Sequence, residues 1–196
     1  MESWQYPLFY PQSISGYEKV RITTTKRTNT TEMEQHTRTL VIFGATGDLC
    51  RRKLIPALED LHRRKLLPDN FKIIGASRTD HDRQSWLETL GKYYKAEFSL
   101  MLDYHRCDLS DVDSLRSIPQ SDDMTYFLSV PPERYADAIQ NLKAAGLVEN
   151  AETSRVVIEK PFGHDYESAD HLQSVVSGCL REKQSIALII ISARYC

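Results

Sequence analysis

Two short motifs contain residue types that could bind a phosphate and orient a ligand. In LVIFGATGDL, residues 40–49, apolar residues lead into Gly44 and Gly47, and three basic residues follow at 51–53. In VIEKPFG, residues 157–163, Lys160 stands directly before Pro161. Glycine lets the backbone turn sharply and approach a ligand closely, and lysine supplies a mobile positive charge. Both motifs suit anion binding if each lies where a strand ends.

The glycine loop alone leaves two interpretations open. Gly44 permits a sharp turn, and Gly47 permits close approach of a diphosphate, whose oxygens the positive end of a following helix would attract. The same glycines also suit a strand-to-helix turn that binds nothing. The loop is not a complete G-x-G-x-x-G fingerprint, so the neighbouring segments of the sequence are needed to choose between a diphosphate-binding loop and a turn without a ligand.

The surroundings predict alternating strands and helices. Apolar runs typical of buried strands lie at 40–44, 72–77, 103–109, 125–130 and 155–159. Helical spacing of apolar residues occurs at 48–66, 86–94, 135–146 and 172–180. Pro56 interrupts the first helix, so we expect a kink or a restart there. Strands without polar alternation, separated by helices, predict a doubly wound α/β sheet that binds ligands at the carboxyl ends of its strands.

Arg78 follows the second predicted strand, where the adenosine ribose of a dinucleotide is bound. An acidic residue at this place binds the 2′-hydroxyl of NAD, whereas an arginine accommodates the 2′-phosphate of NADP. A single surface arginine can also be simply a solvated charge. Its position at the end of the strand favours NADP as the coenzyme.

Lys160 leaves the end of the predicted strand 155–159, and Pro161 restrains the backbone of the residue before it. The lysine could cap an ordinary strand-to-loop exit, or it could hold an anionic substrate at the ligand-binding edge. Both interpretations are compatible with these residues.

Composition and charge exclude several classes of function. The 196 residues carry 25 basic and 27 acidic side chains, which does not suit a protein that coats nucleic acid or a membrane. The four cysteines are scattered and no histidines cluster, so we expect no disulfide framework, no metal site and a cytoplasmic location. No histidine has the context of a catalytic base. The N-terminus has no secretory pattern, and the longest apolar run, 186–191, is too short for a membrane helix.

Four segments, in this order, resemble one enzyme family. VIFGATGDLCRRKLIPAL, IIGASR, YFLSVPPERY and VVIEKPFGHDYESA resemble the N-terminal coenzyme domain of glucose-6-phosphate dehydrogenase, over residues 39–184. The resemblance implies a mostly parallel Rossmann-type sheet. It also implies oxidation of the C1 hydroxyl of glucose 6-phosphate by hydride transfer to NADP, in the pentose phosphate pathway, by an enzyme that forms homo-oligomers.

The resemblance also implies roles for individual residues. The coenzyme would be bound by Gly44, Ala45, Thr46, Gly47, Asp48, Leu49, Lys53, Arg78, Tyr135 and Lys160. Lys160 would contact the sugar phosphate as well, and Pro161 would set the relative placement of substrate and coenzyme. The nicotinamide supplies the hydride chemistry, and the protein supplies orientation and charge.

The resemblance ends near the C-terminus of the chain. Residues 185–196, SIALIIISARYC, stand where the family has a substrate-phosphate signature, followed by a large α+β domain with the catalytic histidine. We therefore expect a mostly disordered or loosely docked tail at 1–37, a coenzyme domain at 38–184 and a divergent segment at 185–196. Because these residues include no catalytic residue, we also expect little enzymatic activity. The alternatives are a non-catalytic NADP-binding module, a truncated gene product, or another Rossmann-type NADP reductase, against which E-K-P-F-G argues.

Overall fold

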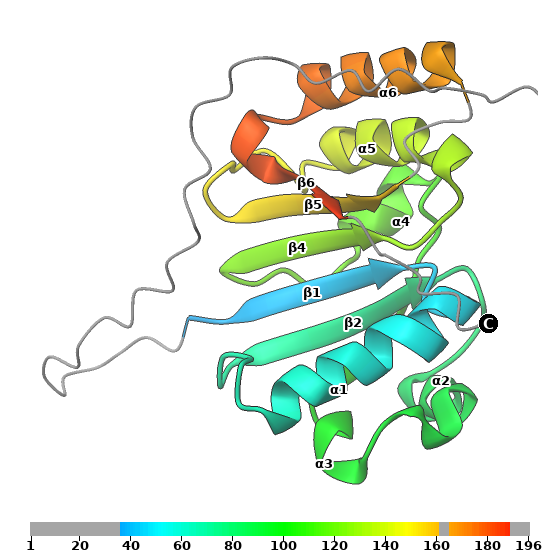
Figure 1. Cartoon of the computed structure of the whole chain (residues 1–196), viewed down its shortest axis with the longest axis vertical. Coiled ribbons are helices and arrows are strands. Elements are labelled where there is room, and N and C mark those ends of the chain that lie inside the picture. Colours follow the sequence, from blue (N-terminus) through cyan, green and yellow to red (C-terminus); the bar gives the residue numbers. More distant parts are fainter. Residues whose placement is uncertain (1–35, 161–164, 189–196) are drawn as a thin grey trace, which may run out of the picture. The chain divides into compact units, whose positions relative to one another are not determined.

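The computed structural model describes residues 36–160 and 165–188. The predictions for residues 1–35, for Pro161 and for residues 189–196 lie outside the described residues. Six strands form one sheet in the order β3-β2-β1-β4-β5-β6, and every neighbouring pair is parallel (Figure 1). The strands are β1 Arg38–Phe43, β2 Phe71–Ser77, β3 Leu102–Arg106, β4 Asp123–Leu128, β5 Ser154–Glu159 and β6 Ser185–Leu188. This strand order confirms the doubly wound fold, with its switch point between β1 and β4.

Helices connect the strands, and the apolar spacing predicts the four longest of them. They are α1 Ile55–Arg63, α2 Arg83–Leu90, α3 Ala96–Ser99, α4 Val112–Arg116, α5 Tyr135–Ala144 and α6 Tyr166–Cys179. The side chains of Asp82, Asp111 and Asp165 accept backbone hydrogen bonds at the start of α2, α4 and α6, which satisfies N–H groups that a helix leaves unpaired. None of the helices within 36–160 and 165–188 is long and apolar enough to cross a membrane.

Pro56 divides the first helical segment, as predicted. A π-helical turn, Cys50–Leu54, leads into α1, and Pro56 is the second residue of that helix. Proline is tolerated in the first turn of a helix because the N–H group that it lacks would have no intrahelical acceptor there. The helix therefore restarts at the proline.

Alternating residues of the strands pack into two hydrophobic cores, one on each face of the sheet. Val41 and Phe43 belong to the core that contains the buried residues of α5 and α6, whereas Ile42 belongs to the core that contains those of α1 and α2. All three side chains are almost fully buried. Burial on both faces explains why the strands show no polar alternation.

Trp86 connects the second core to the glycine loop. Its ring is fully buried, and its indole N–H donates a hydrogen bond of 3.2 Å to the carbonyl oxygen of Ala45. The ring lies against Gly75 of β2, where an added Cβ atom would come within 2.4 Å of the indole. The position of α2 therefore depends on the missing side chain at Gly75.

We predict that Gly75→Ala destabilises the domain by about 1–3 kcal/mol, because the new methyl group overpacks a core without space for it. Thermal unfolding should show a midpoint several degrees lower. Gly178→Ala is the matched control, since no atom lies within 4 Å of its added Cβ and the residue is in α6. Alanine favours helix by up to about 1 kcal/mol, so this variant should be neutral or more stable. Equal midpoints for the two variants would contradict this packing.

Candidate functional site

A groove of about 400 Å³ lies where the carboxyl ends of β1, β2 and β3 meet the segment after β4. This is the edge at which doubly wound sheets bind ligands. The residues that line the groove are Phe43, Gly44, Thr46, Ala76, Ser77, Arg78, Thr79, Cys107, Asp108, Leu109, Val130, Pro131 and Arg134. Three of the residues predicted for the site, Gly44, Thr46 and Arg78, thus come together in one groove.

Gly44 forms the corner between β1 and the loop. Its φ angle is +81°, a left-handed conformation that favours glycine. A Cβ atom at this position would lie 2.1 Å from the carbonyl oxygen of Ser129, which follows β4. The N–H groups of Gly44 and Ala45 both donate to the carbonyl oxygen of Ala76, at 3.0 and 3.2 Å. Glycine is therefore required at 44 by conformation and by space.

The loop after this corner presents backbone N–H groups. Gly47 N–H donates to the carbonyl oxygen of Gly44 at 2.9 Å, which closes the turn. No acceptor within the described part of the chain is found for the N–H groups of Thr46, Asp48 and Leu49. Such donors at the start of a helical segment suit the oxygens of a diphosphate. The described residues therefore fit the diphosphate of a dinucleotide.

Asp48, the acidic residue of this loop, forms ion pairs with the arginines that follow it. The Asp48 carboxylate lies 2.5 Å from a guanidinium nitrogen of Arg51 and 3.6 Å from Nε of Arg52. Arginines that follow the loop thus offset a charge that would repel a phosphate. Arg51 and Arg52 have this local role, whereas Lys53 lies exposed in the π-helical turn.

A hydrogen-bond network holds the turn that carries Arg78. The Tyr104 hydroxyl lies 2.8 Å from Oγ of Ser77 and donates to the carbonyl oxygen of Thr79 at 2.7 Å. Burial raises the pKa of Tyr104, so the hydroxyl keeps its proton and remains a donor. The network fixes the backbone on both sides of Arg78.

Positive charge exceeds negative charge in the groove. Its charged lining residues are Arg78, Arg134 and Asp108. Hydrogen bonds from Ser110 lower the pKa of Asp108, and the two arginines contribute to the same shift. Neither guanidinium makes an ion pair or a hydrogen bond with another described residue. Two cations with one carboxylate in the groove suit an anionic group such as a phosphate.

Arg134 is a residue that the sequence analysis missed. It follows Pro131-Pro132 in a 3-10 turn before α5, and the proline pair predicts only the start of a helix. The feature of the sequence that could have indicated Arg134 is its position a few residues after β4, a strand that pairs with β1. That signal depends on strand order, because β4 is the third strand after β1 in the chain but its neighbour in the sheet.

None of the other predicted residues of the described chain lines the groove, and Ala45, Gly47, Asp48 and Leu49 lie in the adjoining loop. Lys53 is exposed, Lys160 is exposed at the end of β5, and Tyr135 is buried at the start of α5. Burial raises the pKa of Tyr135, while a hydrogen bond to the backbone of Glu159 acts in the opposite direction. Tyr135 thus ties α5 to the end of β5. Pro161 lies outside the described residues.

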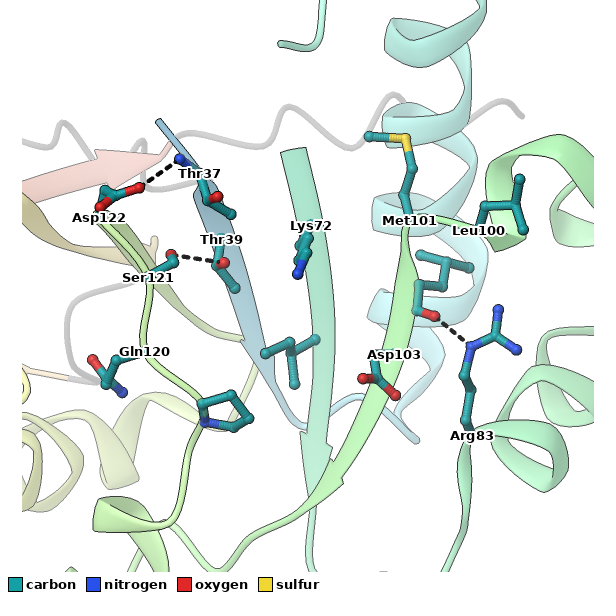
Figure 2. Close-up of a pocket in the computed structure, with 13 residues that line it drawn as sticks. Thr37, Thr39, Lys72, Arg83, Leu100, Met101, Asp103, Gln120, Ser121 and Asp122 are labelled. Carbon is teal, nitrogen blue, oxygen red and sulfur yellow. Dashed lines mark hydrogen bonds between the residues drawn. The ribbon is translucent and has the colours of Figure 1, made fainter. Parts of the chain in front are cut away.

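A larger pocket, of about 600 Å³, lies at the opposite edge of the sheet (Figure 2). Its polar groups largely bond to one another: Ser121 donates to Thr39 Oγ1 at 2.8 Å, and the Thr37 N–H donates to Asp122 at 2.7 Å. Arg83 Nε donates to the carbonyl oxygen of Leu102 at 2.8 Å. These bonds hold the amino ends of the strands together. No group of three or more potential metal ligands occurs in the described ranges.

The fold and the groove define a Rossmann-type dinucleotide-binding domain. The sequence profile described as glucose-6-phosphate dehydrogenase, NAD binding domain, matches residues 41–187. The chain belongs to the glucose-6-phosphate dehydrogenase family, whose members are oxidoreductases, and the matched region is the domain that binds the nicotinamide dinucleotide.

Individual relatives agree with this assignment. Glucose-6-phosphate 1-dehydrogenase of Gluconobacter oxydans is 36% identical over 165 residues, and that of Zymomonas mobilis is 32% identical over 164 residues. Each match covers 74% of this chain and 33% of the relative. A solved glucose-6-phosphate dehydrogenase in complex with glucose 6-phosphate superposes with a TM-score of 0.69 at 28% identity, over 79% of this chain and 36% of that one. The chain therefore spans about a third of the length of these relatives.

We predict that Glu159→Gln raises the thermal midpoint at neutral pH. Burial raises the pKa of Glu159 above its usual 4.5, because the folded protein disfavours the charged carboxylate. Wild-type stability therefore falls as the pH rises from the unfolded pKa through the folded pKa, and glutamine avoids this loss. The difference should vanish below pH 4.5. Exposed Glu149→Gln is the control, and a pH-independent difference at Glu159 would contradict the assignment.

Proposed function

We propose that this chain binds NADP and supplies the coenzyme side of a glucose-6-phosphate dehydrogenase. In that reaction the C1 carbon of glucose 6-phosphate loses a hydride to the nicotinamide and the C1 hydroxyl loses a proton to a base, which gives the lactone and NADPH and feeds the pentose phosphate pathway. The main support is the groove at the carboxyl edge, where unpaired backbone N–H groups adjoin two guanidiniums opposed by one carboxylate. Family membership supports the same function.

The proposed division of roles follows the charges. The N–H groups of Thr46, Asp48 and Leu49 bind the diphosphate, in the loop Gly44–Leu49 that includes Ala45 and Gly47. Arg78 binds the 2′-phosphate, as an arginine at the end of the second strand does in NADP-binding members of this fold. Arg134 contributes a second guanidinium to that phosphate, because both arginines line the same groove.

The substrate would lie at the end of β5. The solved relative described above was captured with glucose 6-phosphate, and we propose the same sugar phosphate as the substrate here. Lys160 would contact the phosphate of the sugar and the coenzyme, with Pro161 setting their relative placement, and Lys53 and Tyr135 would support the coenzyme. The domain limits 38–184, assembly into homo-oligomers and a cytoplasmic location are further parts of this proposal.

The alternative is a module that binds NADP without chemistry. No histidine lines the groove in the described residues, so they supply no candidate base there. A polypeptide of these 196 residues should therefore bind NADP without producing NADPH from glucose 6-phosphate. A thermal-shift titration with NADP, combined with an NADPH absorbance assay, separates the two functions. Steady turnover would contradict the prediction, and a midpoint unaffected by NADP would exclude both functions.

We predict that Arg78→Ala and Arg134→Ala each weaken NADP binding by about 10- to 100-fold, the effect of losing a hydrogen bond to a charged group. Binding of NAD should change little, because NAD has no 2′-phosphate. Calorimetric titration with both coenzymes measures the effect. Arg155→Ala is the control, since Arg155 lies in β5, outside the groove.

Two outcomes would contradict the assignment of the arginines. An equal loss for NADP and NAD would mean that the arginine binds a part common to both coenzymes. A wild-type chain that binds NAD as tightly as NADP would remove the proposed preference itself.

A further inference from the structure

The backbone of Ala45 is held by partners from two other segments of the chain. Its carbonyl oxygen accepts a hydrogen bond of 3.2 Å from the indole N–H of Trp86, whose ring is fully buried. Its N–H group donates to the carbonyl oxygen of Ala76, also at 3.2 Å. The side chain of Ala45 is fully buried as well. The fold therefore fixes both polar groups and the side chain of this residue.

The bond to Trp86 determines the direction of the next N–H group. In a trans peptide unit the C=O and N–H bonds point in opposite directions. The carbonyl group of Ala45 points toward Trp86, which belongs to the core that contains the buried residues of α1 and α2. The N–H group of Thr46, in the same peptide unit, therefore points away from that core.

The groove lies on the other side of the sheet from Trp86. Three residues that line it, Phe43, Ala76 and Cys107, belong to the opposite core, which contains the buried residues of α5 and α6. Thr46 lines the same groove, and its N–H group has no acceptor among the described residues. The hydrogen bond in the core thus directs an unpaired donor toward the groove.

We propose that Trp86 is a positioning residue for the diphosphate of the coenzyme. It contacts no ligand atom. Its indole N–H holds the peptide unit between Ala45 and Thr46 so that the Thr46 N–H is already oriented when a diphosphate oxygen arrives. A donor that is fixed before binding loses less conformational freedom than one that the ligand has to order. This inference rests on the proposed NADP binding and adds a side chain that orients the loop.

Tyr104, which lies beside Trp86, provides a matched control. The centroids of the two rings are 5.6 Å apart. The Tyr104 hydroxyl donates to the carbonyl oxygen of Thr79 at 2.7 Å, next to Arg78. Removal of this hydroxyl changes the same core but loosens the turn proposed to bind the 2′-phosphate. The two rings therefore predict losses of affinity for different parts of the coenzyme.

Calorimetric titration with three ligands tests the proposal. NADP contains the diphosphate and the 2′-phosphate, ADP-ribose contains only the diphosphate, and 2′-AMP contains only the 2′-phosphate. Trp86→Phe should weaken binding of NADP and ADP-ribose by about 10-fold, the effect of one hydrogen bond, and leave 2′-AMP binding within about twofold. Tyr104→Phe should instead weaken binding of NADP and 2′-AMP and leave ADP-ribose binding nearly unchanged.

A second replacement separates the hydrogen bond from the packing of the ring. In β-(3-benzothienyl)alanine a sulfur atom replaces the N–H group of tryptophan, and the shape of the ring is kept. The chain has two tryptophans, so Trp4→Phe is the background in which only position 86 receives this amino acid. We expect the same selective loss of NADP and ADP-ribose affinity as in Trp86→Phe.

The outcomes separate this inference from the proposed function. Equal losses for ADP-ribose and 2′-AMP in the Trp86 variants would show a general effect on the fold and overturn the positioning role. Unchanged ADP-ribose affinity in the benzothienyl chain would show that the N–H group does not act on the loop, and would overturn it as well. Failure of the wild-type chain to bind any of the three ligands would instead contradict the proposed NADP binding.

Discussion

The close approach of two backbone segments at Gly44 is the constraint on which the rest of the site depends. With φ at +81° and the Ser129 carbonyl oxygen 2.1 Å from where a Cβ atom would lie, no side chain fits at this position. The contact brings the ends of β1 and β4 together, and the loop that follows contains the N–H groups of Thr46, Asp48 and Leu49, which have no acceptor among the described residues. A dinucleotide site in this fold requires such amides at the first strand, because a diphosphate has to contact the backbone directly.

The groove beside this contact has an excess of positive charge. Arg78 follows β2 and Arg134 follows β4, and together they exceed the charge of Asp108, which suits a phosphorylated ribose. The amino edge of the sheet contains the larger pocket, but its polar groups mostly bond to one another and hold the strand ends (Figure 2). Charge and hydrogen bonding, and not pocket volume, distinguish the functional edge.

Local signals in the sequence predicted most of the fold, but contacts between distant segments could not be predicted. The apolar runs located the strands, and Pro56 located the restart of the first helix, because both depend on neighbouring residues. Helices α3 and α4 were missed, since each is a single short turn with one buried residue, Phe98 in α3 and Leu115 in α4. The strand predicted at 103–109 was three residues too long, because Cys107 to Leu109 form part of the groove. The place of Arg134 in the groove depends on β4 lying beside β1, which no local pattern contains.

Backbone amide chemical shifts, recorded by NMR during titration of the chain with NADP, would show whether the diphosphate binds at the corner formed by Gly44. We expect the largest changes on the amides of Gly44, Thr46, Asp48 and Leu49, followed by those around Arg78 and Ser129. Amides at the amino edge, such as those of Lys72 and Asp103, should change little. Large changes at that edge, with the glycine loop unaffected, would show that NADP does not bind at the glycine loop.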